Sequence, residues 1–148
     1  MSINKEGRLA YCAHNLIVLR NIKNINEVET FKQHKNRTCC VRFNSCGNWV
    51  ISGDIKGTII IWEADKNYPI RKLYENVMKG MIRDVCWTGD SKRFMVAGEG
   101  TKEFGRALLV DTGSQCGIIN GSTRTCLSID VTKDRPYLLA ITGEDQAV

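Results

Sequence analysis

Residues 40–53 read Cys-Val-Arg-Phe-Asn-Ser-Cys-Gly-Asn-Trp-Val-Ile-Ser-Gly, an apolar run followed by a polar turn and a second apolar run that ends at glycine. The same order returns at residues 84–98, Asp-Val-Cys-Trp-Thr-Gly-Asp-Ser-Lys-Arg-Phe-Met-Val-Ala-Gly, and in part at residues 129–140, Ile-Asp-Val-Thr-Lys-Asp-Arg-Pro-Tyr-Leu-Leu-Ala. The residues that close the first apolar run of each copy are spaced 44 apart: Phe43, Trp87 and Val131. A fixed period of this size indicates that the chain repeats one structural unit.

The apolar residues of each copy alternate with polar ones or form short continuous runs, which predicts strands. Turn residues such as those at 45–48 and 89–91 separate the runs, and no stretch has convincing helical spacing. A period of roughly 40–45 residues with several short strands per unit is typical of a β-propeller blade. The sequence therefore predicts an all-β propeller fold of antiparallel blades.

The expected strands group into two full four-stranded blades, at residues 38–75 and 81–120. Residues 9–32 supply part of an earlier blade, and residues 125–148 begin another. The total is about three blades, whereas propellers typically close with four to eight. We therefore expect residues 1–148 to form a partial propeller that belongs to a longer chain.

The repeats carry parts of the WD signature. In that signature a His near the blade start, a Ser or Thr on the second strand, an Asp in the next turn and a Trp on the third strand form a hydrogen-bonded chain. An indole N–H can only donate, so a buried Trp needs an acceptor. The matching residues are His34, Ser52, Trp62 and, in the last unit, Asp145. The pattern predicts a structural role for them, and His34 is then not a metal ligand.

The signature is incomplete in two places. Lys56 precedes Gly57 where the turn Asp is expected, and Asp54 lies nearby but displaced. Val110-Asp111 stands where the second full blade is expected to have Trp-Asp. The units are therefore interpreted as degraded WD repeats.

Residues 98–105, Gly-Glu-Gly-Thr-Lys-Glu-Phe-Gly, form the most distinctive local pattern. A Gly-x-Gly backbone can approach phosphate oxygens, but the spacing fits neither a dinucleotide fingerprint nor a P-loop, and a predicted strand follows in place of a helix. The segment is better interpreted as a hairpin loop, four residues longer than its counterpart when Val110 is matched to Trp62. Enlarged charged loops on rigid scaffolds often bind partners, and a plain loop is the alternative.

Composition narrows the functional classes. Hydrophobic residues make up 43% and charged residues 25%, as in ordinary globular domains. No apolar stretch approaches the roughly 18 residues of a membrane span. Seven Cys, an odd number without Cys-x-x-Cys spacing, indicate neither a disulfide framework nor a zinc site.

Neither the charge distribution nor the potentially catalytic residues indicate a specific function. The net charge of +5 is modest, and its densest basic set lies between Arg20 and Arg37. This set fits an acidic partner such as a filament or nucleic acid, or ordinary solvated loops. Gly-x-Ser-x-Gly and His-Glu-x-x-His motifs do not occur. We expect no catalytic residue, no metal and no cofactor.

Residues 82–93, Ile-Arg-Asp-Val-Cys-Trp-Thr-Gly-Asp-Ser-Lys-Arg, together with Val-Ala-Gly-Glu-Gly at 96–100 and Phe104-Gly105, resemble the actin-interacting protein 1 family. The similarity extends over nearly the whole chain from about residue 15. Members of that family are double-propeller WD proteins that assist cofilin. Further matching segments are Val18-Leu19-Arg20-Asn21-Ile22, Ser52-Gly53-Asp54, Asp111-Thr112-Gly113-Ser114 and Arg135-Pro136-Tyr137.

The resemblance implies a non-enzymatic cytoplasmic and cytoskeletal protein. It would bind actin filaments and cooperate with cofilin in severing and disassembly, and this chain would match the first part of the N-terminal propeller. The predicted partner contacts are the loop residues Glu99, Lys102, Glu103 and Phe104. The alternative is a general WD scaffold for another protein complex. Neither function involves nucleic acid, a membrane or a small-molecule substrate.

Overall fold

Every regular element in the described part of the chain is a β-strand. The computed structural model describes residues 1–65, 67, 69–119 and 122–145. The strands are β1 (Ser2–Ile3), β2 (Arg8–Ala13), β3 (Leu16–Asn21), β4 (Val28–Phe31), β5 (Thr38–Phe43), β6 (Trp49–Asp54), β7 (Ile59–Glu63), β8 (Ile70–Tyr74), β9 (Ile82–Trp87), β10 (Arg93–Gly98), β11 (Gly105–Leu109), β12 (Gln115–Ile118), β13 (Cys126–Val131) and β14 (Leu139–Gly143).

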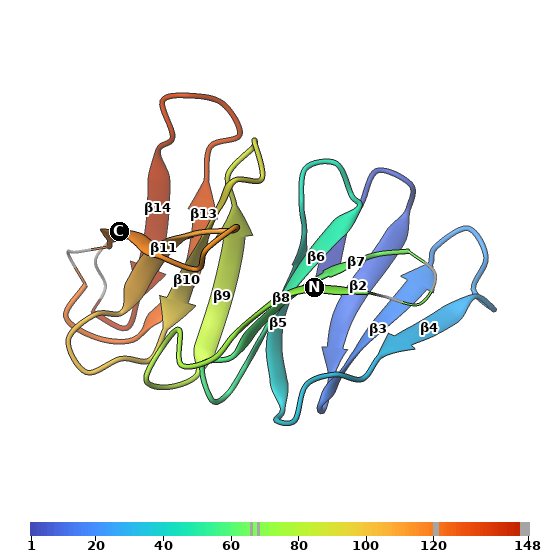
Figure 1. Cartoon of the computed structure of the whole chain (residues 1–148), viewed down its shortest axis with the longest axis horizontal. Coiled ribbons are helices and arrows are strands. Elements are labelled where there is room, and N and C mark those ends of the chain that lie inside the picture. Colours follow the sequence, from blue (N-terminus) through green and yellow to red (C-terminus); the bar gives the residue numbers. More distant parts are fainter. Residues whose placement is uncertain (66, 68, 120–121, 146–148) are drawn as a thin grey trace.

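These strands form three four-stranded antiparallel sheets and one two-stranded sheet. We call β1–β4 the first blade, β5–β8 the second blade, β9–β12 the third blade, and β13–β14 the two-stranded sheet. Figure 1 shows them following one another across the molecule in chain order. The prediction of an all-β fold with about three four-stranded antiparallel blades is confirmed.

The first blade extends further toward the N-terminus than the prediction of a partial blade at residues 9–32. Ser2 pairs with Ala10 and Ile3 with Leu9, so a short β1 completes the sheet as its fourth strand. Two residues are too few for an alternating apolar pattern, which is why the sequence does not reveal this strand. The predicted units 81–120 and 125–148 reach residues 120 and 146–148, which lie outside the described residues.

Hydrophobic cores lie between successive sheets. Side chains alternate across a strand, so β6 directs Val50 toward the first blade and Ile51 toward the third. In β10, likewise, Phe94 faces the second blade and Met95 faces the two-stranded sheet. Each blade therefore depends on its neighbours to cover both of its faces, as expected for repeats that cannot bury their apolar surface alone.

The strand register aligns the second and third blades residue by residue. Val50 pairs with Phe43 on one side and Trp62 on the other. Phe94 pairs in the same way with Trp87 and Leu108. The residue at the position of Trp62 is therefore Leu108, and the assignment of that place to Val110-Asp111 is wrong.

The error comes from the length of the loop between β10 and β11. Gly53 pairs with Ile59, so the five residues 54–58 separate the last paired positions in the second blade. Ala97 pairs with Gly105, so the seven residues 98–104 separate them in the third blade. The loop is two residues longer than its counterpart, not four.

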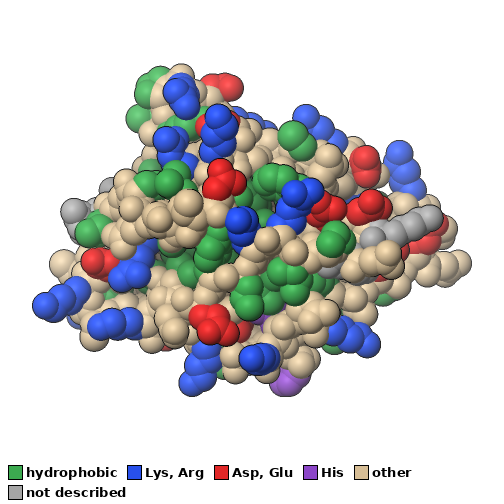
Figure 2. Space-filling model, viewed as in Figure 1, with side chains coloured by type: hydrophobic (Ala, Val, Ile, Leu, Met, Phe, Trp, Pro, Cys, Tyr) green, Lys and Arg blue, Asp and Glu red, His purple; other side chains and the backbone are tan. Residues whose placement is uncertain are grey.

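One edge of the sheets carries, among others, the connections β4–β5 (residues 32–37), β6–β7 (55–58), β8–β9 (75–81) and β10–β11 (99–104). We call it the lower edge, after its place in Figure 1. Figure 2 shows Lys and Arg side chains along this edge, with fewer Asp and Glu side chains among them. The chain thus presents a basic rim on the side that also carries its distinctive loop.

Candidate functional site

A buried polar chain joins three residues of the WD signature. His34 in the β4–β5 connection places its Nε2 2.7 Å from Oγ of Ser52 on β6. Trp62 on β7 donates its indole N–H to the same oxygen at 3.1 Å. One arrangement satisfies the Trp62 indole, the Ser52 hydroxyl and His34 Nε2: Ser52 accepts from Trp62 and donates to Nε2, which leaves the imidazole proton on Nδ1. The buried Nδ1 has no hydrogen-bond partner among the described residues, and it faces the carboxylate of Asp54.

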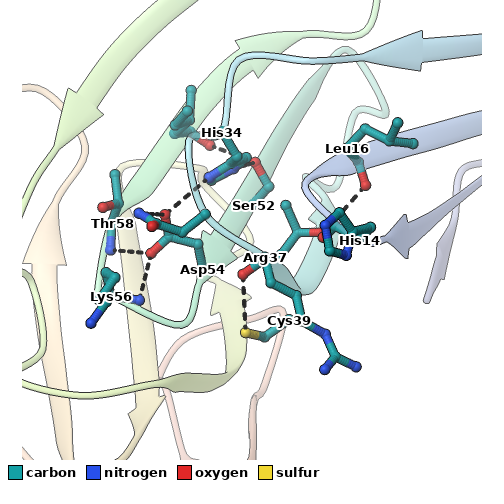
Figure 3. Close-up of polar contacts among 12 residues, drawn as sticks. His14, Leu16, His34, Arg37, Cys39, Ser52, Asp54, Lys56 and Thr58 are labelled. Carbon is teal, nitrogen blue, oxygen red and sulfur yellow. Dashed lines mark hydrogen bonds and ion pairs between the residues drawn. The ribbon is translucent and has the colours of Figure 1, made fainter.

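Asp54 faces the histidine of this polar chain although it is displaced, as predicted, from the expected turn position. Its Oδ2 lies 3.6 Å from His34 Nδ1, and the two side chains are 1% and 0% exposed (Figure 3). Its Oδ1 accepts the backbone N–H groups of Lys56 at 2.9 Å and Thr58 at 3.0 Å. The carboxylate reaches both the histidine and the turn from the end of β6, so the turn position itself is free to carry a lysine.

The environment of His34 favours its neutral form. Burial lowers the pKa of the imidazole, and the nearby Asp54 carboxylate raises it by a smaller amount, so the pKa lies below its usual value. Because a neutral ring matches the hydrogen bonds above, the charge state and the geometry agree. His34 is a structural group in this arrangement.

The third blade has apolar side chains at the same positions. The carbonyl oxygen of Met81 accepts the N–H of Glu99, just as that of Arg37 accepts the N–H of Ile55 in the second blade. Met81 therefore corresponds to Arg37, and Met78, three residues earlier, corresponds to His34. The register places Val96 at that of Ser52 and Leu108 at that of Trp62. All three residues at these positions are buried in the core between the second and third blades.

Asp145 has a comparable local role beside the two-stranded sheet. Gly143 pairs with Cys126, just as Asp54 pairs with Thr38, so Gly143 corresponds to Asp54. Asp145, two residues later, therefore occupies the turn position that Lys56 has in the second blade. Its Oδ2 accepts the hydroxyl of Ser122 at 2.9 Å and the backbone N–H of Thr123 at 2.6 Å. Asp145 therefore fastens the β12–β13 connection to the end of β14.

The four predicted partner contacts share one loop and have different environments in it. Glu99 binds Arg83 at 2.8 Å, and Glu103 binds Arg106 at 2.7 Å. Phe104 is half-buried against the core between the third blade and the two-stranded sheet. Lys102 is exposed. Lys102 is therefore the loop side chain most available to a partner, while partner contact by the other three stays a prediction.

A pocket of about 290 Å³ lies beside this loop and is the feature that sequence reasoning missed. One wall is the loop, from Gly100 to Glu103, and Arg106 lines the pocket as well. Met78 and Lys79 of the β8–β9 connection form the opposite wall. Lys79 directly follows Met78, which corresponds to His34 of the second blade. An alignment of the repeats could therefore have suggested that Lys79 faces the loop.

The described residues offer little for metal or nucleophile chemistry. Among them no group of three or more His, Cys, Asp or Glu side chains could hold a metal ion. Burial raises the pKa of the Cys39 thiol to about 11 and that of Cys86 to about 12, so both are protonated near neutral pH. A protonated thiol is a poor nucleophile.

The described part of the chain also contains no helix of the length and apolarity that crossing a bilayer requires.

The sheets and the polar chain define the class: these are blades of the WD-repeat type. The family described as WD domain, G-beta repeat, matches residues 25–63, the segment that contains His34, Ser52 and Trp62. WD-repeat proteins are generally scaffolds that present surfaces to other molecules.

Relatives narrow this class to one family. WD repeat-containing protein 1 of Rattus norvegicus is 36% identical over 95% of this chain, and that of Xenopus tropicalis is 34% identical over 95%. A 66 kDa stress protein of Physarum polycephalum is 32% identical over 95% of this chain. The chain belongs to the family of WD repeat-containing protein 1, the actin-interacting protein 1 family. It spans only 23% to 24% of the length of these relatives.

Proposed function

We propose that this chain binds actin filaments and cooperates with cofilin in filament severing and disassembly, as a cytoplasmic, cytoskeletal protein without catalysis of its own. The observation that carries the proposal is the enlarged, charged loop at residues 99–104, which stands on a rigid blade in a chain of the actin-interacting protein 1 family. Loops of this kind, held by a packed scaffold, are common sites of partner binding.

The charge of the lower edge supports a protein partner with an acidic surface. The exposed cations there are Lys32, Lys35, Arg37, Lys56, Lys79 and Lys102. Of the carboxylates on these connections and strand ends, Glu75 is exposed, whereas Asp54 faces His34, Glu99 binds Arg83 and Glu103 binds Arg106. An excess of free positive charge on one edge steers an acidic surface toward it and fixes the orientation of the encounter.

Co-sedimentation with filaments tests the proposal. The chain is expected to pellet with cofilin-coated actin filaments and to pellet less with bare filaments. A chain that stays in the supernatant with both kinds of filament would contradict the proposed function.

A charge-balanced variant tests the loop itself. Lys102→Gln combined with Glu103→Gln leaves the net charge unchanged and removes the Glu103–Arg106 ion pair together with the exposed cation. We expect weaker pelleting and an unchanged circular dichroism spectrum. The matched control is Lys133→Gln with Asp134→Asn, an exposed pair in the β13–β14 connection at the opposite edge, which should pellet like the wild type.

A scaffold role in a different protein assembly is the second candidate. It is favoured by the blade architecture alone, which many unrelated functions share. Recovery of a non-cytoskeletal assembly on the immobilised chain, with actin absent from it, would favour this candidate over filament binding.

A further inference from the structure

The pocket beside the β10–β11 loop has walls that are held in place before any partner arrives. A Cβ atom at Gly80 would lie 2.8 Å from Cβ of Glu99, so the β8–β9 connection and the loop are in direct contact. A Cβ atom at Gly100 would lie 1.9 Å from the carbonyl oxygen of Glu103, so the loop closes tightly on itself. Both contacts require glycine, and together they fix the spacing of the two walls.

Arg106 is also fixed. Its Nε donates to Glu103 at 2.7 Å and its Nη1 donates to the carbonyl oxygen of Val77 at 3.1 Å. The guanidinium group has five N–H donors, and these two contacts orient its plane while leaving further donors unused by them. The pocket thus contains a cation whose position does not depend on a ligand.

The charges around the pocket do not balance. Three cations line it, namely Lys79, Lys102 and Arg106, against the single carboxylate of Glu103. Glu103 is paired with Arg106, and among the described residues Lys79 and Lys102 form no salt bridge. Two exposed ammonium groups therefore flank the pocket without a counter-charge from the described part of the chain.

We infer that this pocket is a carboxylate site, which receives an Asp or Glu side chain from an acidic segment of the protein partner. The inference rests on the proposed function only in taking the partner to be a protein. The ammonium groups of Lys79 and Lys102 bind the carboxylate, and Arg106, which also lines the pocket, supplies an oriented donor. Charge-assisted contacts of this kind are stronger than neutral hydrogen bonds.

The size of the pocket favours a side chain over a larger ligand. At about 290 Å³ it lies at the lower limit of the range typical of small-molecule sites, roughly 300–1,000 Å³. One acidic side chain with its adjoining backbone suits this space, and neighbouring acidic residues of the same segment would meet the basic lower edge.

The test is an NMR titration of the ¹⁵N-labelled chain with a blocked tetraglutamate peptide at physiological salt. Blocked tetraglutamine and inorganic phosphate serve as parallel probes. We expect saturable shifts from tetraglutamate at residues 78–79 and 100–106. Lys79→Gln combined with Lys102→Gln should weaken its binding about tenfold. The matched control is Lys23→Gln with Lys133→Gln, which removes the same charge from exposed sites at the opposite edge and should bind like the wild type.

Three results would overturn the inference: phosphate binding without tetraglutamate binding, equal binding of tetraglutamine, or affinity that Lys79→Gln with Lys102→Gln leaves unchanged. Filament co-sedimentation separates this inference from the proposed function. Pelleting with filaments in the absence of tetraglutamate binding would overturn the carboxylate site alone. Tetraglutamate binding in a chain that fails to pellet would support the site and contradict the proposed function.

Discussion

The second and third blades share one backbone register and fill it with different side chains. In the second blade His34, Ser52 and Trp62 form a buried polar chain, and in the third blade the same positions hold Met78, Val96 and Leu108. Both sets are buried, and both leave the inter-blade core intact. The same blade interior therefore accommodates either polar side chains that bond to one another or a wholly apolar set. In the polar set only His34 Nδ1 lacks a hydrogen bond among these three side chains, and the Asp54 carboxylate lies 3.6 Å from it.

The difference extends to the loops that follow. Asp54 ends β6 and binds the backbone of its short turn at Lys56 and Thr58. Gly98 holds the equivalent place in β10, where a Cβ atom would lie 2.2 Å from the carbonyl oxygen of Met81. Without an anchoring carboxylate the third-blade loop is longer, and ion pairs at its surface help to hold it. The second blade keeps more of the WD signature, and the third blade carries the candidate site.

The largest effect is expected from Trp62→Ala. Trp62 is fully buried and stacks on Phe31 with ring centroids 4.2 Å apart, so its removal leaves a large cavity and should cost about 3–5 kcal/mol of unfolding free energy. Leu108→Ala at the matched position should cost less, because a smaller side chain is removed and no hydrogen bond is lost. Urea unfolding measures both, and equal costs would contradict the comparison.

Ser52→Val should destabilise the chain by about 1–3 kcal/mol, although valine is the residue at the matched position of the third blade. The substitution deprives the Trp62 indole N–H of its acceptor and His34 Nε2 of its partner. Ser52→Thr keeps the hydroxyl and serves as the control. If Ser52→Val is as stable as the wild type in urea, the Ser52 hydroxyl contributes nothing to stability and the prediction is wrong.

Replacing the three residues of the polar chain together should cost less unfolding free energy than the three single replacements predict. The triple variant His34→Met, Ser52→Val and Trp62→Leu gives the second blade the third-blade set and leaves no orphaned partner within the chain His34–Ser52–Trp62. We expect its loss of unfolding free energy to fall about 0.5–3 kcal/mol below the sum of the three single losses. Additive losses in the same urea assay would mean that the three residues act independently.

The smallest expected effect is a dependence of the chain's stability on pH that arises from His34. The pKa of His34 is lowered in the folded chain, so the unfolded chain binds more protons on acidification. Stability should therefore be full above the unfolded value of about 6.5 and should fall as the pH drops below it. The fall should be shallower in His34→Met and unchanged in His14→Asn, which alters the exposed turn histidine. Thermal melts between pH 8 and pH 5 measure it.

The fold follows from the sequence because strands, turns and period all repeat in register. The 44-residue spacing places Phe43, Trp87 and Val131 on equivalent inner strands, β5, β9 and β13. The short β1 escapes sequence reasoning because two residues cannot show a strand pattern. Structure reveals it through its pairing with β2 and through Ser2 Oγ, which accepts the Phe43 N–H of the second blade at 3.1 Å. The match of Val110 to Trp62 fails because loop length is not visible until strands are paired.

The candidate site is only partly predictable. The glycine spacing identifies residues 98–105 as unusual, but Lys79 and Arg106 join the pocket through tertiary structure. The role of Asp54 is missed for a related reason, since a carboxylate two residues before the usual turn position can still reach His34 across the hairpin. Sequence position identifies the residue types, and the geometry decides which of them meet.

We propose that the third-blade loop, and not the blade beneath it, carries partner binding. The most direct test replaces residues 99–104 with Ile-Lys-Gly-Phe, which shortens the loop to the second-blade length and keeps an aromatic side chain next to the core. Co-sedimentation with cofilin-coated filaments should then be lost while the thermal melt stays cooperative. Undiminished pelleting of this folded variant would contradict the claim.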